Sequence, residues 1–447
     1  MMETYLIVGA GRSGSDSAKL LLALGKPFVI FDGNTALDTA AVCERIGKTD
    51  VRFLLGTVSD GDLDGINVCV TSPGVPLFSD ILQAVAAKSI PIWSEIELAY
   101  RYDKGTMVAI TGTNGKTTTT ALTYQIIKAW NAQTLLVGNI EIPYTGLVLE
   151  SVPGGMTVAE ISSFQLETMQ TVKPKVSAIL NITPDHLDRH GSMDGYIAVK
   201  ESITKNQDAS DFCVLNYEDA VLRDFGKTLR CKAVFFSSER VLENGWYYKD
   251  GAIRYAENGN ETLLLHTNEL NIVGKHNFEN VMAAAAMAFA VGVPFDVIAA
   301  EAKAFVAVEH RIEFVREKDG VKYFNDSKGT NTDAAIKAID AMPATTVLIG
   351  GGYDKHADFT DWVQRFPGKV RRLILIGQTR EQIAATCDKV GFADYVFAES
   401  LEEAVQLAHA AAQSGDCVLL SPACASWGMF KNYQQRGTMF KDFVNAL

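Results

Sequence analysis

The sequence predicts an α/β fold repeated in three domains, and the order of its apolar segments is the first reason. Short, nearly continuous apolar runs alternate with longer stretches of helical pattern along the whole chain. Such runs are typical of parallel strands that helices cover on both faces. We expect strands at residues 5–8, 28–31, 67–70, 107–111, 134–138, 176–183, 212–216, 346–352, 371–377 and 417–423.

Length and composition are the other two reasons. The chain has 447 residues, and 47% of them are hydrophobic and 21% charged, as in a globular protein with packed cores. At roughly 100 to 200 residues per domain, this length suggests about three domains. One α/β set gives way to another near residues 91–97 and 304–310. We therefore expect domains at 1–95, 96–307 and 308–447.

Two segments depart from the strand–helix alternation. In WYYKDGAIRY, Asp250-Gly251 separates two aromatic or β-branched runs, which predicts a hairpin and a small antiparallel addition to the middle domain. The apolar stretch 281–293 is shorter than a bilayer requires and rich in small residues, so it predicts a buried helix.

Charge and cysteine usage exclude several classes of protein. The net charge of -12 argues against binding to nucleic acid or to an anionic membrane. The seven cysteines include no CxxC pair, which argues against a disulfide framework or a zinc site. The N-terminus leads directly into a strand without the pattern of a signal peptide, so we expect a cytoplasmic protein.

The first glycine-rich segment is GAGRSG, residues 9–14, directly after the first expected strand. Glycines in this position let the chain turn and approach a pyrophosphate, while the next helix points its N-terminus at the anion. Asp32, at the end of the second strand, would accept a hydrogen bond from a ribose hydroxyl. The pattern indicates a nucleotide diphosphate without identifying the attached group, and a turn that only packs the helix remains an alternative.

The second glycine-rich segment is TGTNGKTTTT, residues 111–120, between an expected strand and a helix. Its backbone amides suit phosphates, Lys116 would reach the outer phosphates, and the hydroxyl of Thr117 or Thr118 would bind magnesium. Ile110 stands where the general phosphate-loop pattern has its first glycine. We expect a nucleoside triphosphate loop, with a coincidental Gly-Lys-Thr turn as the alternative.

Polar clusters elsewhere narrow the chemistry. Glu160 and His186 each follow an apolar strand, where a carboxylate and an imidazole suit a divalent metal, although strand ends are often merely polar. Lys200 lies in a helical pattern, where a solvated lysine is the simpler interpretation. In GKHNFEN, the side chains of Asn277 and Asn280 suit helix caps as well as a ligand. A dense polar group in the last domain suits ligand binding, although ion pairs would also explain it; its members are His310, Arg311, Asp326 and Lys328.

Eight segments follow one another along the chain in a fixed order: TGTNGKTTT, GN at 138–139, EISSFQLE, NITPDHLDRH, GKHNFEN, EHRIE, NDSKGTN and SPACASWGMFKNYQQRG. Together, these segments resemble the ATP-dependent Mur ligases of peptidoglycan synthesis over essentially the whole chain. The C-terminal segment is most similar to members that add D-glutamate, and the DNPR-type motif of members that add diamino acids is absent.

The resemblance implies a three-domain architecture and a reaction. The first and last domains would be Rossmann-like, and the central one a P-loop domain. ATP would phosphorylate the L-alanine carboxylate of UDP-N-acetylmuramoyl-L-alanine, and the amine of D-glutamate would then displace phosphate from the acyl phosphate. A monomer that binds neither nucleic acid nor membrane is implied as well.

The resemblance also implies residue roles around ATP. Lys116, His186 and Lys200 would be catalytic, with Thr117 and Glu160 on one Mg²⁺ and with His186 and a carbamylated Lys200 on a second. The other nucleotide-binding positions would be Gly112, Thr113, Asn114, Gly115, Thr118, Asn280, Arg311, Asp326 and Lys328.

The substrate positions follow in the same way. Ser13, Asp32 and Gly74, with Ser72 and Pro73, would hold the uridine diphosphate, so GAGRSG would bind a sugar nucleotide. Gly33 and Asn34 stand where relatives often carry a hydroxyl and an arginine. Trp427 and Tyr433 stand where relatives carry smaller or less polar residues. The muramoyl group would contact Asn139, Gln165 and His186, and D-glutamate would contact Thr330, Lys355, Ser426, Trp427 and Tyr433.

Two other functions fit part of the sequence. A Rossmann oxidoreductase would explain GAGRSG but leaves Lys116 without a role. A P-loop switch would explain Lys116 but not the C-terminal segment. NAD binding would favour the first function, and nucleotide binding without dependence on an amino acid would favour the second.

Overall fold

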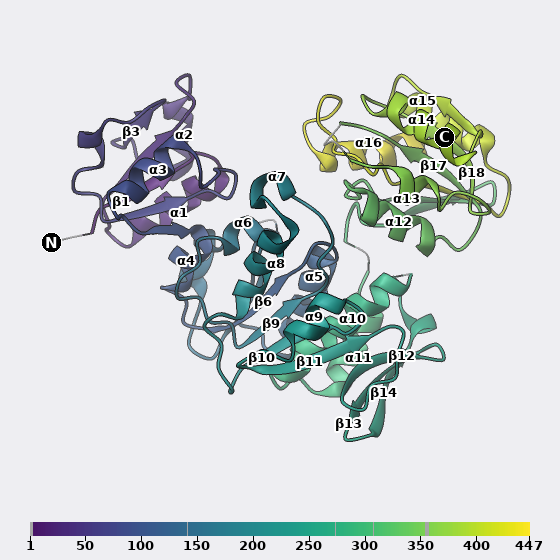
Figure 1. Cartoon of the computed structure of the whole chain (residues 1–447), viewed down its shortest axis with the longest axis horizontal. Coiled ribbons are helices and arrows are strands. Elements are labelled where there is room, and N and C mark those ends of the chain that lie inside the picture. Colours follow the sequence, from purple (N-terminus) through teal and green to yellow (C-terminus); the bar gives the residue numbers. More distant parts are fainter. Residues whose placement is uncertain (1–2, 141, 273, 307, 354–356) are drawn as a thin grey trace. The chain divides into compact units, whose positions relative to one another are not determined.

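The computed structural model describes residues 3–140, 142–272, 274–306, 308–353 and 357–447, and within these its strands form three sheets (Figure 1). Most strand pairs are parallel, so the predicted α/β class with three domains is confirmed. The chain divides into two compact units, Met1–Thr267 with Glu279–Ala302, and Asn268–Phe278 with Lys303–Leu447. The first two sheets lie in the first unit and the third sheet in the second.

The first sheet has the order β3-β2-β1-β4-β5 with all neighbours parallel. This is a Rossmann-like order, in which β1 and β4 border the point where the direction of winding changes. The strands are β1 Tyr5–Val8, β2 Phe28–Asp32, β3 Arg52–Leu55, β4 Val68–Thr71 and β5 Ile92–Ser94. The helices are α1 Arg12–Ala23, α2 Thr39–Ile46, α3 Asp80–Ala87 and α4 Glu95–Tyr100, with the 3₁₀ turn η1 Asp60–Leu63.

The second sheet has the order β14-β13-β12-β11-β10-β9-β6-β8-β7. It is parallel from β7 to β12, and a short connection without a helix joins the last parallel pair, β11 and β12. These strands are β6 Thr106–Thr111, β7 Thr134–Gly138, β8 Met156–Glu160, β9 Val176–Ile179, β10 Phe212–Asn216, β11 Lys232–Ser237 and β12 Gly245–Lys249. The helices between them are α5 Lys116–Trp130, α6 Ser163–Leu166, α7 Leu187–His190, α8 Met193–Glu201 and α9 Ala220–Phe225.

The predicted antiparallel addition is confirmed and is larger than one hairpin. Asp250 and Gly251 both have positive φ, 51° and 73°, as a two-residue turn between antiparallel strands requires. The strand that follows β13 Ala252–Glu257 adds a third member, β14 Asn260–His266, which the sequence analysis missed. The Trp246 ring stacks on Phe295 at 5.4 Å, which packs the hairpin on α11 Phe295–Ala304.

The predicted buried helix at 281–293 is confirmed as part of α10 Lys275–Ala290, whose residues 281–288 are buried. Short 3₁₀ turns complete the region at η2 Tyr144–Gly146, η3 Val148–Glu150, η4 Ser202–Thr204 and η5 Thr267–Glu269. Of the helices that the structure describes, none combines the length and the apolar character needed to span a membrane.

The third sheet has the order β15-β16-β20-β17-β18-β19, and only its β15–β16 edge pair is antiparallel. Its strands are β15 Glu313–Lys318, β16 Val321–Asn325, β17 Thr346–Gly350, β18 Val370–Leu375, β19 Tyr395–Phe397 and β20 Cys417–Leu420. Its helices are α12 Thr332–Ala341, α13 Thr360–Val363, α14 Arg380–Val390, α15 Leu401–Ala411 and α16 Tyr433–Ala446.

Because the strands are parallel, several predicted site residues lie at the carboxyl ends of strands. Carboxyl ends of parallel strands meet at one edge of a sheet, and ligands bind in the loops there. Both glycine segments follow such ends, after β1 and after β6, and Glu160 is the last residue of β8. Asp326 directly follows β16 in the third sheet.

Candidate active site

The first glycine loop is held from behind by a carboxylate. Asp32 Oδ2 accepts the Ala10 N–H at 2.8 Å, and Asp32 Oδ1 accepts the Asn34 N–H at 2.9 Å. Gly14 allows close packing, since a Cβ there would lie 1.8 Å from the Gly9 carbonyl oxygen. Asp32 therefore shapes the loop backbone in addition to any contact with a ribose.

Two further residues fix this loop. Ser72 Oγ donates to the Gly9 carbonyl at 3.4 Å, which brings the predicted segment 72–74 beside the glycines. Arg45 Nη1 lies 3.2 Å from both the Ala10 carbonyl and Ser15 Oγ. The sequence analysis missed Arg45, because an arginine in a surface-like helix carries no signal that points to a carbonyl. Ser13 is half-buried on the first turn of α1, and Gly74 is exposed.

The second glycine loop carries two amines. Gly112 and Gly115 have φ of +147° and +83°, a backbone conformation that residues with a side chain rarely adopt. Helix α5 begins at Lys116, as predicted. Lys116 Nζ donates to the carbonyls of Gly112 at 2.9 Å and Thr113 at 2.8 Å. Lys200 Nζ donates to the same Gly112 carbonyl at 2.8 Å.

Lys200 is a buried amine, not the solvated helical lysine that the simpler interpretation predicted. It is 1% exposed, and its Nζ lies 4.6 Å from the centre of the Tyr196 ring. Burial, together with the positive charge of Lys116, holds the pKa of Lys200 well below its usual value. At a given pH, a larger fraction of Lys200 is therefore in the neutral amine form than for an exposed lysine.

The rest of the loop is tied to the strand on its other side. Thr113 Oγ1 donates to the Thr183 carbonyl at 3.1 Å, and the Asn114 N–H donates to Asn181 Oδ1 at 2.8 Å. Thr119 Oγ1 donates to Asn280 Oδ1 at 3.1 Å, so Asn280 binds helix α5 and does not cap its own helix. The segment after β9 thus contacts the phosphate loop, and Asn280 of α10 contacts the helix that follows the loop.

Glu160 offers an oxygen that suits a magnesium ion. Its Oε1 accepts from Asn139 Nδ2 at 2.8 Å, whereas its buried Oε2 has no hydrogen-bond partner among the described residues. Thr118 Oγ1 is likewise buried without a described partner, and Thr117 is buried beside it. Hydroxyl and carboxylate oxygens are the ligands that Mg²⁺ prefers, so this donor set fits the ion.

His186 and Gln165 occupy different surroundings. His186 has φ of 52°, and its side chain is 40% exposed, with Nε2 at 3.6 Å from Asp185 Oδ2. Gln165 is buried, and its amide donates to Glu95 Oε1 at 2.9 Å and accepts from Ser162. The sequence analysis did not single out Glu95, whose pKa is raised to about 7 by burial.

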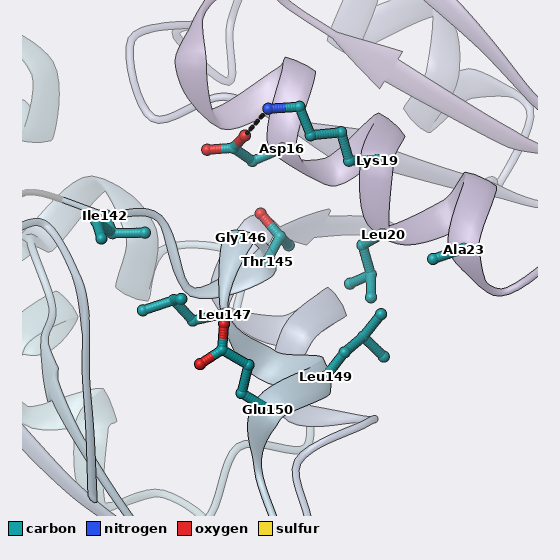
Figure 2. Close-up of a pocket in the computed structure, with 10 residues that line it drawn as sticks. All are labelled: Asp16, Lys19, Leu20, Ala23, Ile142, Thr145, Gly146, Leu147, Leu149 and Glu150. Carbon is teal, nitrogen blue, oxygen red and sulfur yellow. Dashed lines mark hydrogen bonds and ion pairs between the residues drawn. The ribbon is translucent and has the colours of Figure 1, made fainter. Parts of the chain in front are cut away.

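A cavity lies apart from these loops, between α1 and the η2–η3 segment (Figure 2). Its volume is about 430 Å³, and Asp16 on its rim pairs with Lys19 at 3.1 Å. On the opposite wall, the Thr145 N–H donates to Glu95 Oε2 at 3.3 Å. The described lining includes no predicted site residue, and consists of Asp16, Lys19, Leu20, Ala23, Ile142, Thr145, Gly146, Leu147, Leu149 and Glu150.

The second unit holds its own polar cluster. Asp326 is buried and accepts from Ser421 Oγ at 2.8 Å. Burial raises the pKa of Asp326 to about 6, and the positive charge of Arg311 opposes that shift. Lys328 Nζ lies 5.5 Å from the centre of the Tyr433 ring, and the Thr330 N–H donates to the Lys328 carbonyl at 2.9 Å.

The C-terminal signature is organised by Arg436, which the sequence analysis quoted within its motif without a role. Its buried guanidinium donates to the Ser327 carbonyl at 2.8 Å and to the Cys424 carbonyl at 3.2 Å. It thereby joins the NDSKGTN and SPACAS segments. Ser426, at the end of the SPACAS segment, is buried. The exposed Trp427 ring lies 5.4 Å from the ring of Tyr353. Lys355 lies outside the described residues.

His310 belongs to an ion-paired group. Glu309, His310 and Glu313 bring ligand atoms within 4.8 Å of one another, the one such cluster found in the described part of the chain. Lys441 Nζ donates to Glu309 and, at 3.0 Å, to Glu313. This ammonium already pairs with both carboxylates, which agrees with the ion-pair alternative for this position.

Comparison with known proteins places this geometry in a family. The Mur ligase middle domain model matches residues 110–288, and the Mur ligase, glutamate ligase domain model matches residues 310–424. UDP-N-acetylmuramoylalanine–D-glutamate ligase of Lachnospira eligens is 52% identical, with 100% of this chain and 99% of the relative covered. The ligase of the same name from Thermoanaerobacter pseudethanolicus is 46% identical, with 100% and 98% covered.

Solved structures agree in fold. UDP-N-acetylmuramate-alanine ligase MurC from Thermotoga maritima matches with a TM-score of 0.62 at 17% identity, over 100% of both chains. MurF ligase from Thermotoga maritima, in complex with ADP, matches with a TM-score of 0.62 at 18% identity, over 100% of this chain and 96% of that one. At such identities the likeness concerns the fold, and the family follows from the full-length relatives: this chain belongs to the Mur ligases.

Proposed function

We propose that the protein is the ATP-dependent ligase that joins D-glutamate to UDP-N-acetylmuramoyl-L-alanine in peptidoglycan precursor synthesis. The observation that carries the ATP chemistry is the convergence of Lys116 and Lys200 on the Gly112 carbonyl, at the mouth of a strand–loop–helix phosphate site. The names of the full-length relatives support the choice of substrates.

The reaction needs charge neutralisation and alignment more than covalent help from the protein. A carboxylate oxygen of the L-alanine end attacks the γ-phosphorus of ATP, and the bond to the ADP oxygen breaks. The Lys116 ammonium and the loop amides stabilise the negative charge on the phosphate oxygens. The amine of D-glutamate then attacks the acyl carbon, loses a proton, and phosphate leaves as the amide forms.

Magnesium would be held by Thr117 and Glu160, with Thr118 adjacent, and would neutralise phosphate charge when bound. A second ion would be held by His186 and a carbamylated Lys200. The lowered pKa of Lys200 supports this modification, because only a neutral amine adds to CO₂. A ¹³C carbamate NMR signal in protein equilibrated with ¹³C-bicarbonate, lost in Lys200→Met, would support the proposal, and an unchanged spectrum would contradict it.

The remaining contacts are proposed in three groups. Adenosine and its phosphates would be held by Gly112, Thr113, Asn114, Gly115, Asn280, Arg311, Asp326 and Lys328. The muramoyl substrate would be held by Ser13, Asp32, Gly74, Asn139, Gln165 and His186. D-glutamate carries two carboxylates and needs cations and polar donors, which would come from Thr330, Lys355, Ser426, Trp427 and Tyr433.

We further propose domain boundaries at 95/96 and 307/308, and a monomer that works in the cytoplasm, where ATP and nucleotide-linked sugars are available. Sedimentation at micromolar concentration would test the oligomeric state. A mass of one chain is expected, and a mass of two chains would contradict it.

The function is tested by phosphate release from ATP and magnesium in the presence of UDP-N-acetylmuramoyl-L-alanine. D-glutamate, L-glutamate, L-lysine and no amino acid are compared in parallel. We expect release only with D-glutamate. Release with another amino acid would keep the family but reject the substrate, and no release with any of them would reject the proposal.

A further inference from the structure

Arg189 spans two loops that belong to different sheets. It lies on α7, and its Nη1 donates to the Pro73 carbonyl at 2.9 Å while its Nη2 reaches the Val75 carbonyl at 3.2 Å. The same guanidinium donates to both oxygens of Glu167, at 2.6 Å and 3.3 Å. It lies 4.1 Å from the centre of the Phe164 ring, and its side chain is only 11% exposed.

One end of this contact reaches the first glycine loop. The Ser72 N–H donates to the Val8 carbonyl at 2.9 Å, and the Val75 N–H donates to the Ser72 carbonyl at 3.0 Å. Ser72 is packed so closely that a Cβ on Gly9 would lie 2.8 Å from its Oγ. A displacement of residues 73–75 would therefore displace Ser72 and, with it, Gly9.

The other end reaches the edge that carries Glu160. Glu167 Oε1 lies 3.3 Å from His190 Nδ1, and His190 Nε2 lies 3.0 Å from Ser163 Oγ. Burial lowers the pKa of His190, so a neutral ring with Nδ1–H toward Glu167 fits this arrangement. Ser163 begins α6, three residues after the end of β8 at Glu160.

Arg101 provides a comparison within the same unit. It is also ion-paired, to Glu97 at 2.8 Å, and it lies over an aromatic ring, Trp93, at 3.9 Å. Its described contacts include no carbonyl of a glycine loop or of residues 72–75. The planar guanidinium fork of Arg189, in contrast, meets a carboxylate and two carbonyls at once, which a lysine cannot do.

We propose that Arg189 is a positioning residue that fixes the 73–75 segment, and through it the first glycine loop, relative to the phosphate-transfer site of the central sheet. The inference rests on the proposed function for its substrate. A sugar nucleotide anchored by its diphosphate at the first loop would then present its carboxylate to the Lys116 side. Misplacement by about 1 Å is enough to cost about 10²-fold in rate.

The test compares Arg189→Lys with Arg101→Lys in the full-length protein. For Arg189→Lys we expect kcat/KM for UDP-N-acetylmuramoyl-L-alanine to fall at least about tenfold, since hydrogen bonds from a charged group are lost. KM for ATP and the melting temperature should match those of Arg101→Lys, which should keep full activity. Unchanged kinetics for Arg189→Lys, or an equal rise in both KM values, would overturn the proposal.

A second readout is independent of catalysis. Hydrogen exchange at the Ser72 and Val75 amides should be at least about tenfold faster in Arg189→Lys than in the wild type or Arg101→Lys, because the loop loses its restraint. Equal exchange in all three proteins would overturn the proposal even if activity falls. If the wild type shows no ligase activity, the proposed function fails, and the exchange rates still decide whether Arg189 holds the loop.

Discussion

The two glycine loops of the first unit share a backbone plan but differ in the side chains that contact them. Each follows a buried parallel strand and opens a helix, at Arg12 and at Lys116. The first is backed by the Asp32 carboxylate, which accepts a loop amide, and by the Arg45 guanidinium, which donates to the Ala10 carbonyl. The second carries two lysine amines on one carbonyl. The glycine pattern alone indicates an anion site, whereas the side chains behind each loop determine which phosphate group it can serve.

The physical reason is the charge of the ligand. A diphosphate that only anchors a substrate needs backbone amides and a helix N-terminus. A triphosphate whose terminal group is transferred needs cations where charge builds up. The comparison therefore predicts that substitutions in the second loop reduce the rate of the reaction, whereas substitutions in the first reduce substrate binding.

The largest effect is expected for Lys116→Met. Removing the ammonium should lower kcat for phosphate release by about 10³-fold, because Lys116 is the only basic residue of the 111–120 loop and stabilises the charge that builds up on the transferred phosphate. Lys128→Met, on an exposed position of the same helix, is the matched control and should retain activity. Comparable activity in both variants would break the distinction between the loops.

The next effect concerns the backbone of the first loop. Gly14→Ala forces a Cβ to within 1.8 Å of the Gly9 carbonyl oxygen, whereas a Cβ on Gly11 meets nothing within 4 Å. We expect Gly14→Ala to destabilise the protein by about 3 kcal/mol in urea unfolding, and to weaken UDP binding. Gly11→Ala should leave the free energy of unfolding unchanged, and equal stability of the two variants would contradict the packing argument.

A smaller effect tests Glu95, which follows the first sheet and holds Gln165 beside the second. Burial raises the pKa of Glu95 to about 7, so the folded state holds its proton more tightly than the unfolded chain does. Its contribution to stability is present at low pH and is lost as pH rises from about 4.5 through 7. Relative to the wild type, Glu95→Gln should gain about 2 kcal/mol between pH 5 and pH 8.

Thermal unfolding of both proteins across that pH range measures the difference. A parallel pH dependence for Glu95→Gln and the wild type would show that another group titrates in this window.

The smallest effect is expected for Asp32→Asn. The amide oxygen can still accept one N–H, but the loop loses a charge-assisted hydrogen bond, so KM for the muramoyl substrate should rise about fivefold. KM for ATP should not change. Asp38→Asn, which alters an exposed helix cap at Ala41, is the control. A rise in KM for ATP would contradict the separation of the two sites.

Much of the fold was predictable from neighbouring residues. The strand–helix alternation, the helix start at Lys116, the hairpin at Asp250-Gly251 and the buried helix at 281–293 all follow from periodicity and turn chemistry. Glu160 was correctly expected at a strand end. These features depend on residues that are close in sequence. The order of the motifs along the chain also allowed the family to be predicted.

The tertiary structure decided which polar groups are buried and what they meet. Lys200 reaches a carbonyl 88 residues away, and Arg189 reaches carbonyls 114 and 116 residues away. Glu95 and Arg436 are buried by contacts of the same long range. Every residue carries a carbonyl, so the sequence gives no sign of which one a distant lysine or arginine will meet. Only the packing of the sheets and loops selects that partner, and with it the pKa and the role of the side chain.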